Sequence, residues 1–188
     1  MFIDIILKMA IYTKGGDKGN TGKFSSSGNS GLRVSKDSLV VEVLGAVDEF
    51  NSFLGIIKTK TTEKSLIRNI KNIQENLLTI GSITGGSGLK FSKSETIKLE
   101  RIIDSLESSL PVLKNFIIPG GDMVAAQLQY ARALSRRVER RMVALSSEEK
   151  VSPFILQYLN RLSDALFMLA RQANFAQGQT EEVWKSQK

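Results

Sequence analysis

The chain has 188 residues, enough for one domain with a hydrophobic core, and its 41% hydrophobic and 24% charged residues are ordinary for a globular protein. An excess of Lys and Arg (26) over Asp and Glu (19) gives a formal charge of +7, which favours an anionic partner such as a nucleotide, a nucleic acid or an acidic membrane. Cysteine and histidine are absent, which excludes disulfides, thiolate nucleophiles, zinc sites of the usual kind and a Ser-His-Asp triad. Any chemistry must therefore use carboxylates, Arg, Lys, hydroxyls, backbone amides or a bound cofactor.

Residues 1–10 form an apolar opening stretch that contains Asp4. Because this stretch has no basic beginning and no small-residue cleavage pattern, we do not interpret it as a signal peptide. It is either an extension ahead of a start at Met9 or a pairing strand, and residues 11–188 then form a single domain. No later stretch approaches the ~18 consecutive apolar residues of a membrane span. We therefore expect a cytoplasmic protein with no membrane partner.

A long segment without helical periodicity runs from Ile11 to about Ser35, and loops of this length are usually functional or disordered. Its first part, residues 11–22, contains four glycines, two lysines and two threonines. Glycines let backbone N–H groups converge on an anion, while lysines and hydroxyls can reach a phosphate or its metal. It is not a Walker A loop, because the Gly-Lys pair at 22–23 is followed by Phe24. Taken alone, the segment fits a phosphate-binding loop and a flexible surface loop equally well.

Five helical segments follow this loop, and no strand is needed to explain the sequence. Apolar residues recur at helical spacing in each segment. A capping-box pattern at residues 92–95 opens the third segment, Asp122 caps the fourth, and Pro153 suits the first turn of the fifth. The expected helices cover about 37–57, 63–83, 92–111, 123–145 and 153–177. We predict an all-α fold, a five-helix antiparallel bundle with a structured glycine-rich N-terminal loop.

The fourth expected helix is unusually rich in arginine. Its arginines stand at positions 132, 136, 137, 140 and 141. At ~100° per residue, Arg132, Arg136 and Arg140 share one face about 80° wide, with Glu139 at its edge. The planar fork of arginine suits phosphate and carboxylate recognition. A basic face that binds nucleic acid nonspecifically, or that only faces solvent, is the alternative.

Two other helices carry polar residues where a simple solvent-facing surface would not need them. On the fifth, one face combines amide, acid, aromatic and guanidinium groups. These are Asn160, Asp164, Phe167, Arg171 and Asn174. They indicate a site, a subunit contact or a buried network such as an Asp164–Arg171 pair. On the first, Asp48 lies among apolar residues and is expected to meet an arginine; if that is Arg132 across an interface, breaking the pair would leave a costly buried charge.

Five short segments gain meaning when they are taken together. They are residues 12–19, 45–52, 116–121, 131–140 and 158–164. In this order they resemble the propanediol-utilisation type of ATP:cob(I)alamin adenosyltransferase, and the resemblance extends from Ile11 to about Asn174. Phe50 stands where the family usually has Leu, a conservative change.

The resemblance implies a homotrimer of five-helix bundles with active sites between neighbouring subunits. The implied reaction transfers the 5′-deoxyadenosyl group of ATP to cob(I)alamin and gives adenosylcobalamin and triphosphate. ATP and cobalamin are then the substrates, and Mg²⁺ is bound mainly through ATP, with no protein ligand assigned to it. An external reductase is the expected partner that supplies cobalt(I).

The resemblance also implies roles for individual residues. Asp48 and Arg132 would pair between subunits, Phe116 would close the lower face of the corrin, and Arg136 would position the triphosphate; these four are the expected catalytic residues. The expected ATP-binding residues are Thr13, Lys14, Gly15, Gly16, Thr21, Lys36, Arg136, Arg137, Glu139, Arg140 and Asn160.

The absence of histidine agrees with this reaction, because the cobalt(I) of the substrate is itself the nucleophile. Two alternatives remain. A nucleic-acid-binding helical protein would lose affinity steeply with salt, but it gives no reason for the glycine-rich loop or for Asp48. A noncatalytic nucleotide or corrinoid carrier would need the same pockets as the enzyme.

Overall fold

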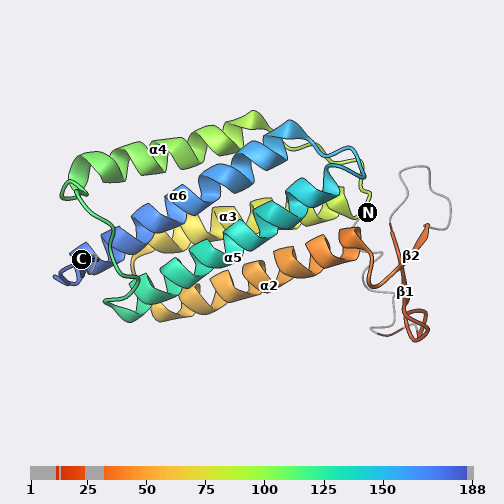
Figure 1. Cartoon of the computed structure of the whole chain (residues 1–188), viewed down its shortest axis with the longest axis horizontal. Coiled ribbons are helices and arrows are strands. Elements are labelled where there is room, and N and C mark those ends of the chain that lie inside the picture. Colours follow the sequence, from red (N-terminus) through yellow and green to blue (C-terminus); the bar gives the residue numbers. More distant parts are fainter. Residues whose placement is uncertain (1–11, 13, 24–31, 186–188) are drawn as a thin grey trace.

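The structure, a computed structural model, describes residues 12, 14–23 and 32–185, so Thr13 and the N-terminal extension at residues 1–10 lie outside the described residues. Helices make up most of the described chain, and successive helices run in alternating directions (Figure 1). They are α2 (Leu39–Lys60), α3 (Lys64–Thr84), α4 (Lys93–Ser109), α5 (Met123–Leu145) and α6 (Pro153–Ala176). The predicted five-helix antiparallel bundle is confirmed, and each helix ends close to its expected position.

Local capping explains where several helices begin. The Asp122 carboxylate accepts a hydrogen bond from the Val124 N–H at 2.8 Å and so satisfies one of the free amides at the start of α5. The Glu63 carboxylate does the same for α3 by accepting from the Ser65 N–H at 2.9 Å. Pro153 opens α6, where its fixed φ and missing N–H are suited to the first turn.

The capping box predicted for α4 does not form, although Ser92 still caps the helix. The Ser92 hydroxyl accepts from the Ser94 N–H at 3.2 Å, whereas the capping box would have it accept from the Glu95 N–H. The Glu95 carboxylate, however, accepts from the Asn76 amide at 3.1 Å and from Lys98 at 2.8 Å. Glu95 therefore ties α4 to α3, because a partner on the neighbouring helix is within its reach.

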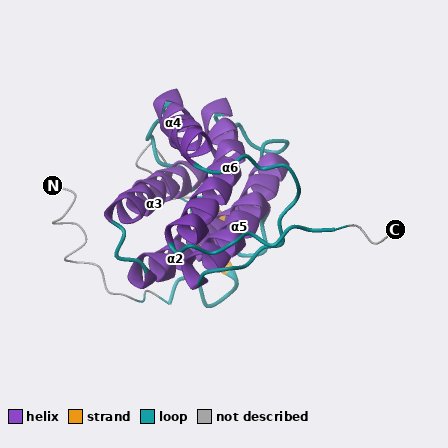
Figure 2. Ribbon diagram, turned by 90° about the vertical axis from the view of Figure 1, so that its left-hand side faces the viewer, coloured by secondary structure: helices purple, strands orange, loops and turns teal. Residues whose placement is uncertain are grey.

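The core lies along the axis of the bundle, where α6 packs against α4 and α5, and α2 packs against α5 and α3 (Figure 2). Tyr158 is fully buried there, with its ring 5.1 Å from that of Phe91 and its hydroxyl accepting from Asn76 at 3.2 Å. Burial raises the pKa of Tyr158, so the hydroxyl stays protonated. None of the helices in the described part of the chain is long and apolar enough to cross a membrane.

The expectation that the chain needs no strand is wrong. Two three-residue strands, β1 (Asn20–Gly22) and β2 (Arg33–Ser35), pair antiparallel with Thr21 opposite Val34, and this hairpin lies beyond the start of α2 (Figure 1). An isolated antiparallel bridge also joins Ile117 to Val183. Strands of this length in a segment rich in glycine and serine give no alternating apolar pattern, so periodicity could not reveal them.

Candidate active site

The glycine-rich segment forms a tight turn that leads into the hairpin. The Asp17 N–H donates to the Lys14 carbonyl at 3.3 Å, and the Gly19 N–H donates to the Gly16 carbonyl at 3.2 Å. Lys14 and Gly19 both have a positive φ (56° and 78°), which glycine adopts freely and lysine rarely does. The Arg33 guanidinium then donates to backbone carbonyls of the turn and of β1, so the turn is a defined structure.

Lys36 lies directly over this turn. A Cβ added to Gly16 would come within 3.0 Å of the Lys36 Nζ, and the Lys36 N–H donates to the Gly19 carbonyl at 2.8 Å. Lys14 and Lys18 are exposed on the same turn, so three ammonium groups are close to one short stretch of backbone. The structure thus brings together the two parts of the expected ATP site that are about 20 residues apart in sequence. Their role in binding ATP stays a prediction.

The hairpin is also tied to the far half of the chain. The Lys23 Nζ donates to the Glu149 carboxylate at 2.7 Å, which connects the residue after β1 to the connection between α5 and α6. Thr21 is half-buried in β1 and lines a hollow of about 290 Å³ between the hairpin, α2 and α3. Asp48 lines the same hollow from α2, and its side chain is exposed.

The arginines of α5 separate into two groups. Arg137 forms an ion pair with Glu49, and Arg141 forms one with Glu42, so both hold α5 to α2. Arg136 and Arg140 are exposed, and among the described residues neither makes an ion pair. Arg137, one of the expected ATP-binding residues, is therefore engaged with α2, whereas Arg136 and Arg140 are not.

The arginine face continues onto α6. The Asn160 amide donates to the Glu139 carboxylate at 2.8 Å and joins the two helices. Below it, Arg132 and Arg136 line a hollow of about 230 Å³ over α4, α5 and α6, and the Arg132 Nε donates to Gln129 at 2.9 Å. The other residues lining this hollow are Ile103, Glu107, Ser163, Asp164, Phe167 and Met168.

Within one chain, Asp48 and Arg132 do not meet. They line different hollows, one on the α2–α3 side and the other on the α4–α6 side, and no ion pair between them occurs in residues 32–185. The suggested Asp164–Arg171 pair is wrong. Asp164 pairs instead with Arg161 at 3.0 Å, since both lie on the same helix one turn apart.

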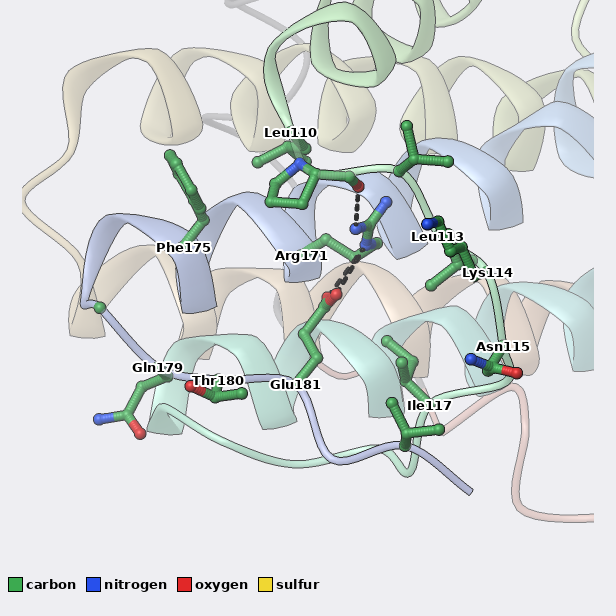
Figure 3. A pocket seen from close by; sticks show the side chains of 14 residues that line it. Leu110, Leu113, Lys114, Asn115, Ile117, Arg171, Phe175, Gln179, Thr180 and Glu181 are labelled. Atoms are coloured by element: carbon green, nitrogen blue, oxygen red, sulfur yellow. Dashed lines mark hydrogen bonds and ion pairs between the residues drawn. The ribbon is translucent and has the colours of Figure 1, made fainter. Parts of the chain in front are cut away.

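Phe116 is presented on a loop between α4 and α5 and is 82% exposed. This loop pairs with the C-terminal tail, because the Trp184 N–H donates to the Phe116 carbonyl and the Ile118 N–H donates to the Glu182 carbonyl, each at 2.8 Å. A pocket of about 490 Å³ lies between loop and tail (Figure 3). The sequence does not reveal this contact, since the three paired residues of the tail carry no periodic signal.

The other end of the loop is fixed by Asn174 of α6. Its side-chain oxygen accepts from the Asp122 N–H at 2.9 Å, and its amide donates to the Gly120 carbonyl at 3.1 Å. Gly121 has φ +95°, and a Cβ added there would overlap the Asn174 amide. The two glycines before α5 thus belong to a specific turn, and Gly121 has both a conformational and a steric reason to be glycine.

The fold and the site together define a helical-bundle protein with a glycine-rich cationic turn at one place and an exposed arginine face at another. The family model for cobalamin adenosyltransferase matches residues 11–173, and the chain belongs to this family.

Individual relatives agree with this assignment. The chain is 39% identical over 178 residues to a corrinoid adenosyltransferase of Bacillus subtilis, covering 90% of this chain and 89% of the relative. It is 37% identical over 187 residues to corrinoid adenosyltransferase MMAB of Mus musculus, covering 93% and 77%. A solved structure of a phenylalanine-to-alanine variant of the PduO-type ATP:corrinoid adenosyltransferase from Lactobacillus reuteri, complexed with cobalamin and ATP, matches with a TM-score of 0.88 and 33% identity. That match covers 94% of this chain and all of that one (100%).

Proposed function

We propose that the protein transfers the 5′-deoxyadenosyl group of ATP to cob(I)alamin and releases triphosphate. The observation that carries this proposal is the family match over residues 11–173, a range that includes the glycine-rich turn, Asp48, Phe116 and the arginine face of α5. The fold supports it through its likeness to a structure that holds both substrates.

The reaction requires the protein to orient its substrates and to stabilise charge more than to supply a reactive side chain. A bond forms between the substrate's cobalt(I) and C5′ of ATP while the C5′–O bond breaks, and the electron pair of that bond leaves with the triphosphate. No side chain has to act as nucleophile or base, which suits a chain without histidine or cysteine. Exposed Arg136 and Arg140 would bind the triphosphate, align C5′ with cobalt and stabilise the leaving charge.

The ATP site that we propose has two walls. One is the glycine-rich turn with Lys14, Gly15, Gly16, Thr21 and, over it, Lys36. The other is on α5 and α6. Its residues are Arg136, Arg137, Glu139, Arg140 and Asn160. Thr13, which lies outside the described residues, belongs to the first wall by its place in the same segment. Mg²⁺ would arrive on the triphosphate, and in the described ranges no group of three or more acidic, His or Cys side chains could hold a metal ion.

We further propose that these sites lie between subunits of a homotrimer. The support is that exposed Asp48 and half-buried Arg132 line hollows on different sides of one chain, where a neighbour could reach each of them. An external reductase would supply the cobalt(I), as the resemblance to the family implies.

The trimer can be tested with Asp48→Asn, which removes the charge that Arg132 of a neighbour would meet. We expect the trimer to dissociate at micromolar concentration and activity to fall with it, since an unpaired buried charge costs about 3 kcal/mol or more. Sedimentation velocity measures the assembly, and Asp104→Asn on the exposed face of α4 is the matched control. A variant that remains trimeric and fully active would show that Asp48 has no intersubunit partner.

The reaction itself is tested by mixing the protein with reduced cobalamin, ATP and Mg²⁺. We expect the visible spectrum of an alkylcobalamin to appear together with one equivalent of triphosphate per product formed. A spectral change on binding without triphosphate would reject the transferase and favour a noncatalytic carrier.

A further inference from the structure

The C-terminal half of α6 carries two buried polar residues that the proposed reaction does not use. Arg171 and Asn174 are each only 6% exposed and lie three residues apart, so they are neighbours on one face of the helix. Both reach out of the helix to other segments of the chain. Asn174 holds the end of the Phe116 loop, as described above, and Arg171 holds its beginning.

Arg171 binds two separate segments at once. Its Nε donates to both oxygens of the Glu181 carboxylate, at 3.0 Å and 3.1 Å, and its Nη2 donates to the Pro111 carbonyl at 2.8 Å (Figure 3). A guanidinium with several donors in a fixed plane is suited to such a double contact, and lysine is not. Because the group is buried, loss of either partner would leave charge or donors unsatisfied.

The two segments that Arg171 binds are the two that pair around Phe116. Pro111 begins the loop, and five residues later the Phe116 carbonyl accepts from Trp184. Glu181 stands immediately before the tail residues that pair with the loop, including Val183 opposite Ile117. Arg171 thus holds each of the two segments at a point N-terminal to its paired residues.

Phe116 itself has little else to hold it. Its side chain is 82% exposed, so packing within the chain does not determine where the ring lies. Its position depends on the backbone of the loop, and on one side that backbone is held by the tail.

We propose that Arg171 is a positioning residue for Phe116, acting through the C-terminal tail. The inference rests on the proposed function for its catalytic consequence, because Phe116 is there expected to contact the corrin. The structural part of the inference, that Arg171 holds the tail and thereby the loop, does not depend on that function. Arg171 touches neither substrate, and its effect is confined to the corrin and leaves ATP binding unchanged.

The structural part is tested by fluorescence, since Trp184 is the single tryptophan of the chain. Trp184 is 54% exposed, so in Arg171→Gln we expect acrylamide to quench it only moderately more strongly, because the tail is released. Glu181→Gln keeps the shape but removes the charge, and should give a smaller change in the same direction. Arg101→Gln, an exposed arginine on α4, is the control and should change nothing. Unchanged acrylamide quenching of Trp184 in both Arg171→Gln and Glu181→Gln would overturn the proposal.

The catalytic part is tested by comparing the two substrates. Arg171→Gln should raise the KM for cobalamin about tenfold, which corresponds to about 1.4 kcal/mol, and leave the KM for ATP unchanged. A general folding defect would affect both substrates, so an equal rise in both constants would overturn the positioning role. If Arg171→Gln does not fold, Glu181→Gln carries the same comparison.

A double-mutant cycle with Phe116→Ala separates this mechanism from a direct role of Arg171 in corrin binding. If Arg171 acts through Phe116, adding Arg171→Gln to Phe116→Ala should cause no further loss, whereas independent effects would multiply and contradict the proposal. If the wild-type protein makes no adenosylcobalamin, the proposed function fails. Quenching of Trp184 and a spectral titration with cobalamin then still decide whether Arg171 positions the loop.

Discussion

The two halves of α6 hold their polar side chains in different ways. Toward its N-terminus, Asn160 and its partner Glu139 lie next to Arg136 and Arg140, which are exposed and make no ion pair in the described part of the chain. We call this N-terminal half of α6, together with the neighbouring residues of α5, the open half. Toward the C-terminus of α6, Arg171 and Asn174 are buried and hydrogen-bonded to neighbouring segments. We call this half of α6, together with the turn before α5 that Asn174 holds, the pinned half.

This difference fits the two substrates of the proposed reaction. A triphosphate is highly charged and has many hydrogen-bond acceptors. Arginines without ion-pair partners can therefore form strong charge-assisted hydrogen bonds when it binds. A corrin is large and rigid, and recognising its face requires an aromatic side chain held in place before binding. The open half is thus completed by its ligand, and the pinned half is organised within one chain.

The largest expected effect is a loss of kcat when an arginine of the open half is removed. Arg136→Ala should lower kcat by about 10²- to 10³-fold, as expected for loss of one charge-stabilising group at a leaving phosphate. Because Arg136 is exposed, the melting temperature should not change. Triphosphate release measures the rate, and Arg101→Ala is the control. An unchanged rate would show that the triphosphate binds elsewhere.

The second-largest expected effect is a loss of stability when the turn before α5, in the pinned half, is disturbed. Gly121→Ala forces a side chain into a left-handed backbone and against Asn174, so we expect the free energy of unfolding to fall by about 2 kcal/mol. Gly120→Ala is a close control, because a Cβ there would meet nothing within 4 Å. Urea unfolding measures both variants. Equal stability of the two would contradict the role of Asn174 in fixing this turn.

A smaller effect concerns the other wall of the ATP site. Lys36→Gln should raise the KM for ATP about tenfold through loss of one charge-assisted contact worth about 1.4 kcal/mol, with the KM for cobalamin unchanged. Lys90→Gln, an exposed lysine between α3 and α4, serves as control. If the constant for cobalamin rose instead, the turn under Lys36 would belong to the corrin site.

The smallest effect is a pH dependence in the bundle beneath the open half. Burial raises the pKa of Glu95, but hydrogen bonds from Lys98 and Asn76 outweigh it and lower the pKa below its ordinary value of 4.5. Glu95 therefore contributes stability above its unfolded pKa and loses that contribution as the pH falls through its folded pKa. Thermal unfolding of wild type and Glu95→Gln should differ at pH 7 and converge below pH 4.5. A difference that persists in acid would mean that the hydrogen-bond geometry, not the charge, is responsible.

The helices could be predicted from the sequence because each one has an apolar stripe at helical spacing, and Ser92 and Asp122 could be recognised as caps. The hairpin could not, since three-residue strands show no alternation. The partner of Arg171 was wrong for a related reason. Periodicity compares residues on one helix and so suggested Asp164, whereas Glu181 lies in an irregular tail that only the folded chain brings back.

The site shows the same limit. The chemistry of the glycine-rich segment and of the arginine face could be recognised from residue types alone. Which arginines are free could not, because the ion pairs of Arg137 and Arg141 depend on how α2 packs against α5. The location of Lys36 over the turn likewise requires the hairpin that the sequence did not reveal.

The ion pair between Lys23 and Glu149 joins residues 126 positions apart in the sequence. During synthesis, the glycine-rich turn leaves the ribosome early, yet this anchor cannot form until the chain has been made through the end of α5. The first part of the site to be translated is therefore among the last to be secured. Pausing translation before Glu149 would leave a nascent chain whose N-terminal hairpin is still accessible to proteases, and resuming it would protect that segment.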